Sequence, residues 1–151
     1  MKNVELKRER IHHLWHEALP LLEAHWREIE DNPDIALDPD MGLFEKLEDM
    51  GWLRVYTARA DTGELLGYAC FIVKAHLHHR QSKQAICDAV YLKPLYRKGG
   101  LGYRLIKYAD DELQREGVQV VMHHAKVAHD FGPLLLKLGY RHTENVYMRR
   151  L

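Results

Sequence analysis

Residues 94–102 read Pro-Leu-Tyr-Arg-Lys-Gly-Gly-Leu-Gly, and the interpretation of the whole chain starts from them. They lie between an alternating apolar segment, residues 84–92, and residues 102–116, whose apolar positions follow a helical period. Three glycines within four positions let backbone N–H groups converge without obstruction by side chains. At a helix N-terminus such N–H groups and the helix dipole favour an anion, and Arg97 and Lys98 add positive charge. The stretch therefore predicts a site for a phosphate or pyrophosphate.

Two common phosphate-binding motifs do not fit this stretch. A mononucleotide P-loop requires Lys-Ser or Lys-Thr after its last glycine, and neither pair occurs here. A dinucleotide fingerprint requires Gly-x-Gly-x-x-Gly after the first strand, whereas three predicted strands precede residues 94–102. A glycine-rich turn with basic surface residues remains the plain alternative.

Outward from this stretch, the periodicity predicts one domain of mixed α and β structure over residues 1–151. The upstream elements begin with a short strand at 3–7 and a helix over 11–30, which we expect to be kinked or divided at Pro20. A second helix runs from 38–39 to Gly51. An antiparallel meander of three strands follows; it begins at Leu53 and continues through 65–76 and 84–92. The second helix is expected to bury Leu43, Phe44, Leu47 and Met50. Downstream we expect a helix over 102–116, a strand over 118–125, a helix over 130–138 and a last strand or pair of strands over 140–151. This succession requires crossover connections and at least one parallel strand pair.

The composition limits the classes of partner. The 151 residues are 46% hydrophobic, and 22 basic residues balance 22 acidic ones, so no basic excess favours nucleic acid or an anionic membrane. No apolar run approaches the length of a membrane span, and the first ten residues lack the apolar core of a signal peptide. Cys70 and Cys87 lack zinc-ligand spacing and are expected to be buried thiols in a reducing compartment. We expect a soluble cytoplasmic protein without a metal, nucleic acid or membrane partner.

The chain also resembles a known family, the GNAT superfamily of N-acetyltransferases. Arg97-Lys98-Gly99-Gly100-Leu101-Gly102 matches its Arg/Gln-x-x-Gly-x-Gly/Ala motif, and residues 90–96 look like the strand and Pro-x-Tyr that precede it. Lys137-Leu138-Gly139-Tyr140 is similar to the family's Lys-x-Gly-Phe/Tyr ending. The order of predicted elements matches from about residue 10 to residue 151.

The resemblance implies a mostly antiparallel sheet with a splayed parallel pair and flanking helices. An acyl-coenzyme A would insert into the splay, with its pyrophosphate on the N–H groups of residues 98–103 and its pantetheine arm along the preceding strand. The residues implied to bind the coenzyme are Val90, Tyr91, Leu92, Arg97, Lys98, Gly99, Gly100, Leu101, Gly102 and Tyr103. The implied reaction transfers an acetyl group directly from acetyl-CoA to a primary amine, with no covalent acyl-enzyme.

Asp88 is the first candidate for a catalytic group. It is the acid in the strand before the glycines, and strand alternation predicts one face for Asp88, Val90 and Leu92. Members of the family often keep a carboxylate on this strand as a base or as a handle for the amine. A carboxylate in an apolar strand should have a raised pKa, which suits a base. Pairing with a neighbouring basic group is the structural alternative.

The remaining catalytic candidates are less determined. The family's usual acid, a tyrosine five residues before the final Phe/Tyr, is replaced here by Leu135, and Tyr147, Tyr91 or Tyr140 could substitute for it. His123 or His124 should face the splay, and histidine is the side chain most often used as an acid or base near neutral pH. We take Asp88, His124 and Tyr147 as the catalytic set.

The acceptor and the alternatives stay open at this point. Acidic residues cluster between residues 28 and 40, and in this fold that loop borders the acceptor site, so they would favour a cationic amine. His76 and His78 have strand spacing for two metal nitrogens, but no third ligand completes the set. A small-molecule or peptide amine acceptor and a homodimer are expected. The missing tyrosine also allows a catalytically weak acyl-CoA-binding module, and a third alternative is an interaction protein that dimerises through its sheet and N-terminal helices.

Overall fold

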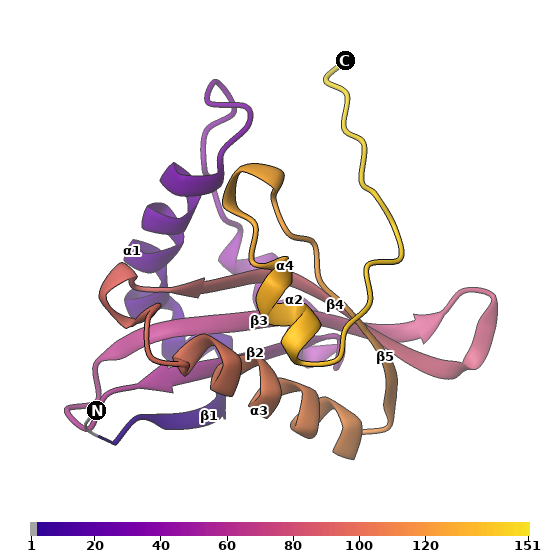
Figure 1. The fold of residues 1–151 in the computed structure, drawn as a ribbon, viewed down its shortest axis with the longest axis horizontal. Helices are drawn as coiled ribbons and strands as arrows, with labels where there is room; N and C mark the ends of the chain where they lie inside the picture. The colour runs from indigo at the N-terminus through magenta and orange to yellow at the C-terminus, as the bar shows by residue number, and fades with distance from the viewer. Residues whose placement is uncertain (1–2) are drawn as a thin grey trace.

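The computed structural model describes residues 3–151, and one five-stranded sheet forms its centre, in the order β1-β2-β3-β4-β5 (Figure 1). The elements are β1 (Glu5–Glu9), α1 (Ile11–Ile29), α2 (Met41–Asp49), β2 (Leu53–Arg59), β3 (Leu65–His76), β4 (His79–Leu92), α3 (Leu101–Arg115), β5 (Val118–Met122) and α4 (Gly132–Lys137), with single 3-10 turns at Pro94–Tyr96 and Val127–His129. Neighbours from β1 to β4 pair antiparallel, and β4 pairs with β5 in parallel. The predicted mixed fold is confirmed; residues 1 and 2 of the predicted domain lie outside the described residues.

The sheet separates two apolar clusters because successive side chains of a strand point to opposite faces. On one face, Leu101 and Leu105 of α3 pack against Tyr56 and Phe71 of the sheet. On the other face, Leu14 of α1 packs with Val55 and Tyr68, and Phe44 of α2 adds to the same cluster. Helix α3 thus covers one face of the sheet, and α1 and α2 cover the other. The segment between β4 and α3 leads from the sheet to the face that α3 covers.

The structure decides one alternative for α1 and corrects one prediction for α2. Helix α1 continues through Pro20, so it is not divided into two helices. Both Pro20 and His16, whose carbonyl loses the bond that a proline cannot donate, are exposed, and water can satisfy that carbonyl. Leu43 and Met50, predicted to be buried, are 51% and 52% exposed.

The buried position of α2 is taken instead by a charged residue. Glu48 is buried, and its carboxylate accepts bonds from Arg10 Nε at 2.7 Å and from the Ile11 N–H at 3.1 Å. This contact satisfies one of the unpaired N–H groups at the start of α1. Asp40 caps α2 by accepting from the Leu43 N–H at 3.0 Å, so the helix begins two residues later than Asp38 predicted.

The prediction of a strand over residues 140–151 is wrong. This segment contains neither helix nor strand, and Figure 1 shows it, in yellow, leaving the body of the molecule. Val146, Tyr147 and Met148 are exposed. A strand requires a neighbour to bond and a face to bury, and alternation in the sequence supplies neither. Among the described helices, none has the length and apolar character needed to cross a membrane.

Candidate functional site

The two parallel strands separate along their length. β5 pairs with β4 from Lys83↔Val118 to Ile86↔Met122, and for β4 residues 87–92 the described part of the chain provides no paired strand on that side. Buried backbone N–H and C=O groups require partners, so this edge can accept an extended ligand as a sheet accepts a strand. The splay implied by the resemblance is present, and Val90, Tyr91 and Leu92 lie on it.

The glycine loop, residues 97–102, continues from the end of this free edge into α3. Gly99 and Gly100 have φ angles of 98° and 84°, which side chains of L-residues rarely allow. Gly100 is the N-cap of α3, and no described side chain caps this helix end. The N–H groups of the first helical turn, from Leu101 to Tyr103, therefore remain free for an anion. Because the side chains of Tyr91, Leu92 and Leu101 are buried, we expect these residues to contact a bound coenzyme through backbone groups only.

The two basic side chains of the glycine loop differ in their contacts. Arg97 donates from Nε to the Leu92 carbonyl at 2.9 Å and from one terminal nitrogen to both oxygens of Glu28 at 2.7 and 2.8 Å. Its guanidinium also lies over the Tyr91 ring, 5.2 Å from the centroid. Arg97 therefore ties the loop to α1 with its charge neutralised, whereas no ion-pair partner of Lys98 occurs among the described residues.

A bulge in β4 determines where Asp88 points. Cys70 of β3 pairs with Ala89 and Phe71 pairs with Cys87, so Asp88 is the extra residue. Two residues opposite one interrupt the strand alternation. Asp88 consequently lines the α1–α2 face, whereas Val90 and Leu92 pack toward α3. The prediction that the three share a face is therefore wrong.

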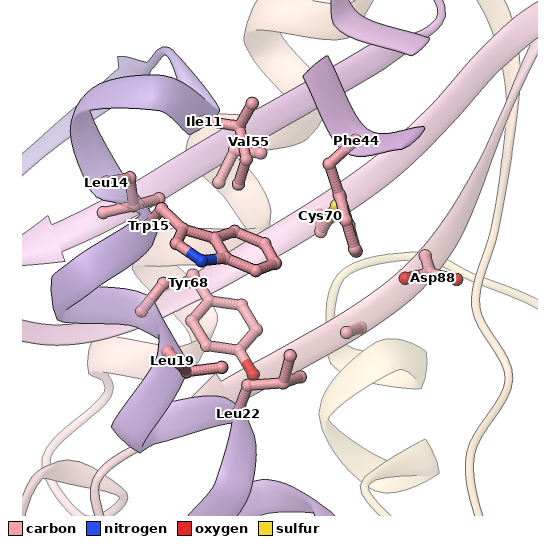
Figure 2. A pocket seen from close by; sticks show the side chains of 12 residues that line it. Ile11, Leu14, Trp15, Leu19, Leu22, Phe44, Val55, Tyr68, Cys70 and Asp88 are labelled. Atoms are coloured by element: carbon pink, nitrogen blue, oxygen red, sulfur yellow. The ribbon is translucent and has the colours of Figure 1, made fainter. Parts of the chain in front are cut away.

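A recess lies beside Asp88, between α1, α2 and the sheet (Figure 2). Its volume is about 50 Å³. Figure 2 shows the side chains of Trp15, Phe44 and Tyr68 around it and Asp88 at its edge on β4. Asp88 is exposed to solvent, but the surrounding protein still removes part of the hydration of its carboxylate, which raises its pKa above the usual range. A carboxylate with a raised pKa thus lies near the free edge of β4.

A tyrosine and a histidine that the sequence did not single out also lie at this face. The Tyr68 hydroxyl is 3.3 Å from Nδ1 of His25, and the His25 ring lies 5.1 Å from the Tyr91 ring. Burial lowers the pKa of His25, so its imidazole is neutral at pH 7. Burial raises the pKa of Tyr68, which keeps its hydroxyl protonated. The one available signal was a histidine between Leu22 and Trp26, inside an apolar helical stripe.

Comparison with known proteins decides the family. The model of the acetyltransferase (GNAT) family matches residues 9–139. The chain belongs to this GNAT family. The match contains the free edge of β4, the glycine loop and Asp88, so the sequence resemblance is confirmed for the family and for the fold.

Solved GNAT structures have the same fold. An aminoglycoside acetyltransferase from an uncultured soil metagenomic sample, in complex with sisomicin, has a TM-score of 0.76 at 16% identity, covering 98% of this chain and 96% of that one. A ribosomal-protein-alanine N-acetyltransferase from Brucella melitensis has a TM-score of 0.73 at 19% identity, covering 99% of each chain. A predicted acetyltransferase with acetyl-CoA from Clostridium acetobutylicum has a TM-score of 0.73 at 11% identity, covering 98% and 96%. No curated protein matches the sequence.

The other catalytic candidates of this GNAT chain do not gather around Asp88. His124 is exposed just beyond the end of β5, and Tyr147 is 90% exposed in the C-terminal segment. Tyr140 donates to Asp110 of α3 at 2.7 Å, and burial, together with this bond, raises the pKa of its hydroxyl. Leu135, at the family's tyrosine position, is buried in α4. The roles of His124 and Tyr147 stay predictions.

His123, the neighbour of His124, has an unusual environment. Its ring packs edge-to-face against Phe71, Phe131 and Tyr140, with centroid distances of 5.2 to 6.0 Å. Both ring nitrogens are buried and lack a hydrogen-bond partner in the described structure. Burial, with a smaller contribution from His124, lowers the pKa of His123 to about 4. A neutral imidazole is therefore part of the packing at the end of β5.

Contacts within the chain occupy most of the acidic residues from 28 to 40. Glu28 pairs with Arg97, Asp31 with Lys126, and Asp34 with Arg150. Asp40 caps α2, and Glu30 accepts from the Asn32 N–H. Most of the carboxylates predicted to attract a cationic amine are thus already satisfied by the chain itself.

The structure gives no support to a metal site. His76 and His79 stack at 4.8 Å between ring centroids at the end of the β3–β4 hairpin, with His78 beside them. Within the described residues, no group of three or more histidines, cysteines, aspartates or glutamates is arranged to hold a metal ion. Cys70 and Cys87 are free and buried, as expected.

Proposed function

We propose that this chain is an N-acetyltransferase that transfers the acetyl group of acetyl-CoA directly to a primary amine in a ternary complex. The observation that carries the proposal is the junction at Asp88. On one side, the free edge of β4 runs into the glycine loop, which fits an extended thioester ending in a pyrophosphate. On the other side, Asp88 faces the recess between α1 and α2. Both substrates could therefore meet at this residue.

The proposed chemistry places the attacking nitrogen at Asp88. The amine nitrogen forms a bond to the thioester carbonyl carbon, the carbon–sulfur bond breaks, and the pair of electrons leaves on the sulfur. The Asp88 carboxylate accepts the proton that the nitrogen loses, and its raised pKa makes it a stronger base than an aspartate with an ordinary pKa. A thiol has a pKa of about 8.5, so the sulfur can leave as a thiolate without an acid at Leu135.

The cysteines support direct transfer. Burial raises the pKa of the Cys87 thiol, and its side chain belongs to the core on the α3 face. Because the thiolate is the reactive form, Cys87 is a poor nucleophile for an acyl-enzyme. Two reduced thiols also suit a reducing compartment, so a cytoplasmic location stays our prediction, as does a homodimer without nucleic acid or membrane partners.

The second candidate, an acyl-CoA-binding module with little turnover, is favoured by Leu135 alone. Calorimetric titration with acetyl-CoA, followed by thiol release in the presence of primary amines, separates the two. We expect micromolar binding and amine-dependent thiol release. Binding without thiol release from any amine would support the module. Absence of binding would mean that the glycine loop is only a turn, and both candidates would be wrong.

A further inference from the structure

The charge around the recess argues against a polycationic acceptor. Glu28 at the end of α1 and Asp31 and Asp34 in the following loop are paired with Arg97, Lys126 and Arg150, so these pairs add no net negative charge. Among the described residues that line the recess, Asp88 is the one with a charged side chain. A single carboxylate is complementary to a single ammonium group.

The walls of the recess are apolar. Trp15 and Phe44 lie 5.6 Å apart between ring centroids, and Leu22 and Ala18 of α1 continue the same surface. Apart from Asp88, the polar groups in the lining carry no negative charge: the Trp15 indole nitrogen can only donate, burial raises the pKa of the Cys70 thiol, and the Tyr68 hydroxyl, 3.3 Å from Nδ1 of His25, is neutral. A second ammonium group would lose its hydration here without gaining a partner.

The recess is small and open to solvent on one side. Its volume of about 50 Å³ is enough to hold more than one water-sized group, so its apolar walls can cover a short arm while the rest of a longer molecule stays outside. A short branched alkyl group fits this description.

We propose that the acceptor is a primary monoamine on a short, branched apolar arm, with the arm in the recess beside Trp15 and Phe44 and the nitrogen at Asp88. This inference rests on the proposed acetyltransferase function and specifies its substrate class. It separates this chain from the aminoglycoside acetyltransferase whose fold it shares, since sisomicin is a polycation.

The first test compares amines at saturating acetyl-CoA. We expect kcat/KM for isoamylamine to exceed that for spermidine and for sisomicin at least tenfold. A peptide that begins with leucine also presents a primary amine next to a branched alkyl group. The ratio of its kcat/KM to that of isoamylamine shows whether the recess prefers a peptide N-terminus or a free amine. A polycation as the better substrate, or acetyl-CoA binding without turnover of isoamylamine, would overturn the inference alone. Loss of acetyl-CoA binding itself would overturn the proposed function as well.

The second test fills the recess. Ala18→Leu adds three carbon atoms to a lining position, and His16→Leu adds a leucine to an exposed position of the same helix. We expect Ala18→Leu to raise KM for isoamylamine at least tenfold while leaving turnover of methylamine, which has no arm, within about twofold. His16→Leu should change neither. Equal losses for isoamylamine and methylamine in Ala18→Leu, or no loss for either, would contradict the proposal; unchanged acetyl-CoA affinity verifies that the variant folds.

Discussion

The glycine loop and the recess lie on either side of Asp88 and β4, but different groups build them. The glycine loop offers backbone N–H groups, and its shape depends on glycines with positive φ at positions 99 and 100. The recess is formed by side chains from α1, α2, β2, β3 and β4, which come together only in the folded chain. A site made of backbone is encoded locally, whereas a site made of side chains is encoded by tertiary packing.

The largest expected effect tests the backbone origin of the glycine loop. Gly100 and Gly63 have nearly equal φ angles, 84° and 87°, and an added Cβ would meet no described atom within 4 Å at either position. The backbone strain of Gly100→Glu and Gly63→Glu should therefore be similar, roughly 1–2 kcal/mol. Only Gly100→Glu places a carboxylate where the pyrophosphate would bind. We expect calorimetry to detect at least a hundredfold weaker acetyl-CoA binding for Gly100→Glu and unchanged binding for Gly63→Glu. Equal losses would show that strain, not charge, is responsible.

The second prediction concerns the junction between the two sites. Asp88→Asn should lower kcat roughly 10²- to 10⁴-fold, the usual contribution of a general base, with acetyl-CoA affinity unchanged. Because the pKa of Asp88 is raised in the folded state, its ionisation opposes folding above its ordinary pKa. The variant should thus keep or gain thermal stability at pH 7.

Asp110→Asn is the matched control for Asp88. Burial raises the pKa of this carboxyl too, but it bonds to Tyr140 on the α3 side. We expect its kcat to stay within about threefold of wild type. Similar slowing in both variants, or a lower Tm for Asp88→Asn, would remove the case for a base at the recess.

His123, at the end of β5 next to the splay, should make the stability of the protein depend on pH. The pKa of His123 falls from an ordinary 6.5 to about 4 on folding, so its neutral form stabilises the protein above pH 6.5. That contribution, about 3 kcal/mol, is lost as the pH falls from 6.5 to 4, because the unfolded chain takes up the proton first. His123→Phe keeps the aromatic packing without a titrating group. Urea unfolding at pH 7 and at pH 4.5 measures the free energy of unfolding at each pH. The decrease between the two should be smaller for His123→Phe than for wild type, whereas His129→Phe, at an exposed position, should show the same decrease as wild type. An unchanged decrease in His123→Phe would contradict the pKa assignment.

The same contrast explains what the sequence could and could not predict. Residues 97–102 predicted the glycine loop because glycines alone permit its dihedral angles. The direction of Asp88 could not be predicted, since the bulge depends on register between β3 and β4. The ion pairs of the acidic residues could not be predicted for a similar reason: the partners of Glu28, Asp31 and Asp34 lie 69, 95 and 116 residues away. Residues 140–151 alternated like a strand, but alternation does not indicate whether a neighbouring strand is available.

The smallest expected effect separates the two basic side chains of the glycine loop. Glu28 neutralises Arg97, so Arg97→Gln should leave acetyl-CoA affinity within about twofold, provided that the loop keeps its fold. Lys98→Gln removes a charge that is not shared with a described carboxylate, and an exposed charge contributes roughly 0.2–1 kcal/mol, or up to about fivefold in affinity. This loss should shrink as salt is raised from low to physiological concentration, because the charge is exposed. Calorimetry at two salt concentrations measures both values. A larger loss for Arg97→Gln would mean that Arg97 leaves Glu28 when the coenzyme binds, which would make the glycine loop depend on a side chain from α1 as the recess does.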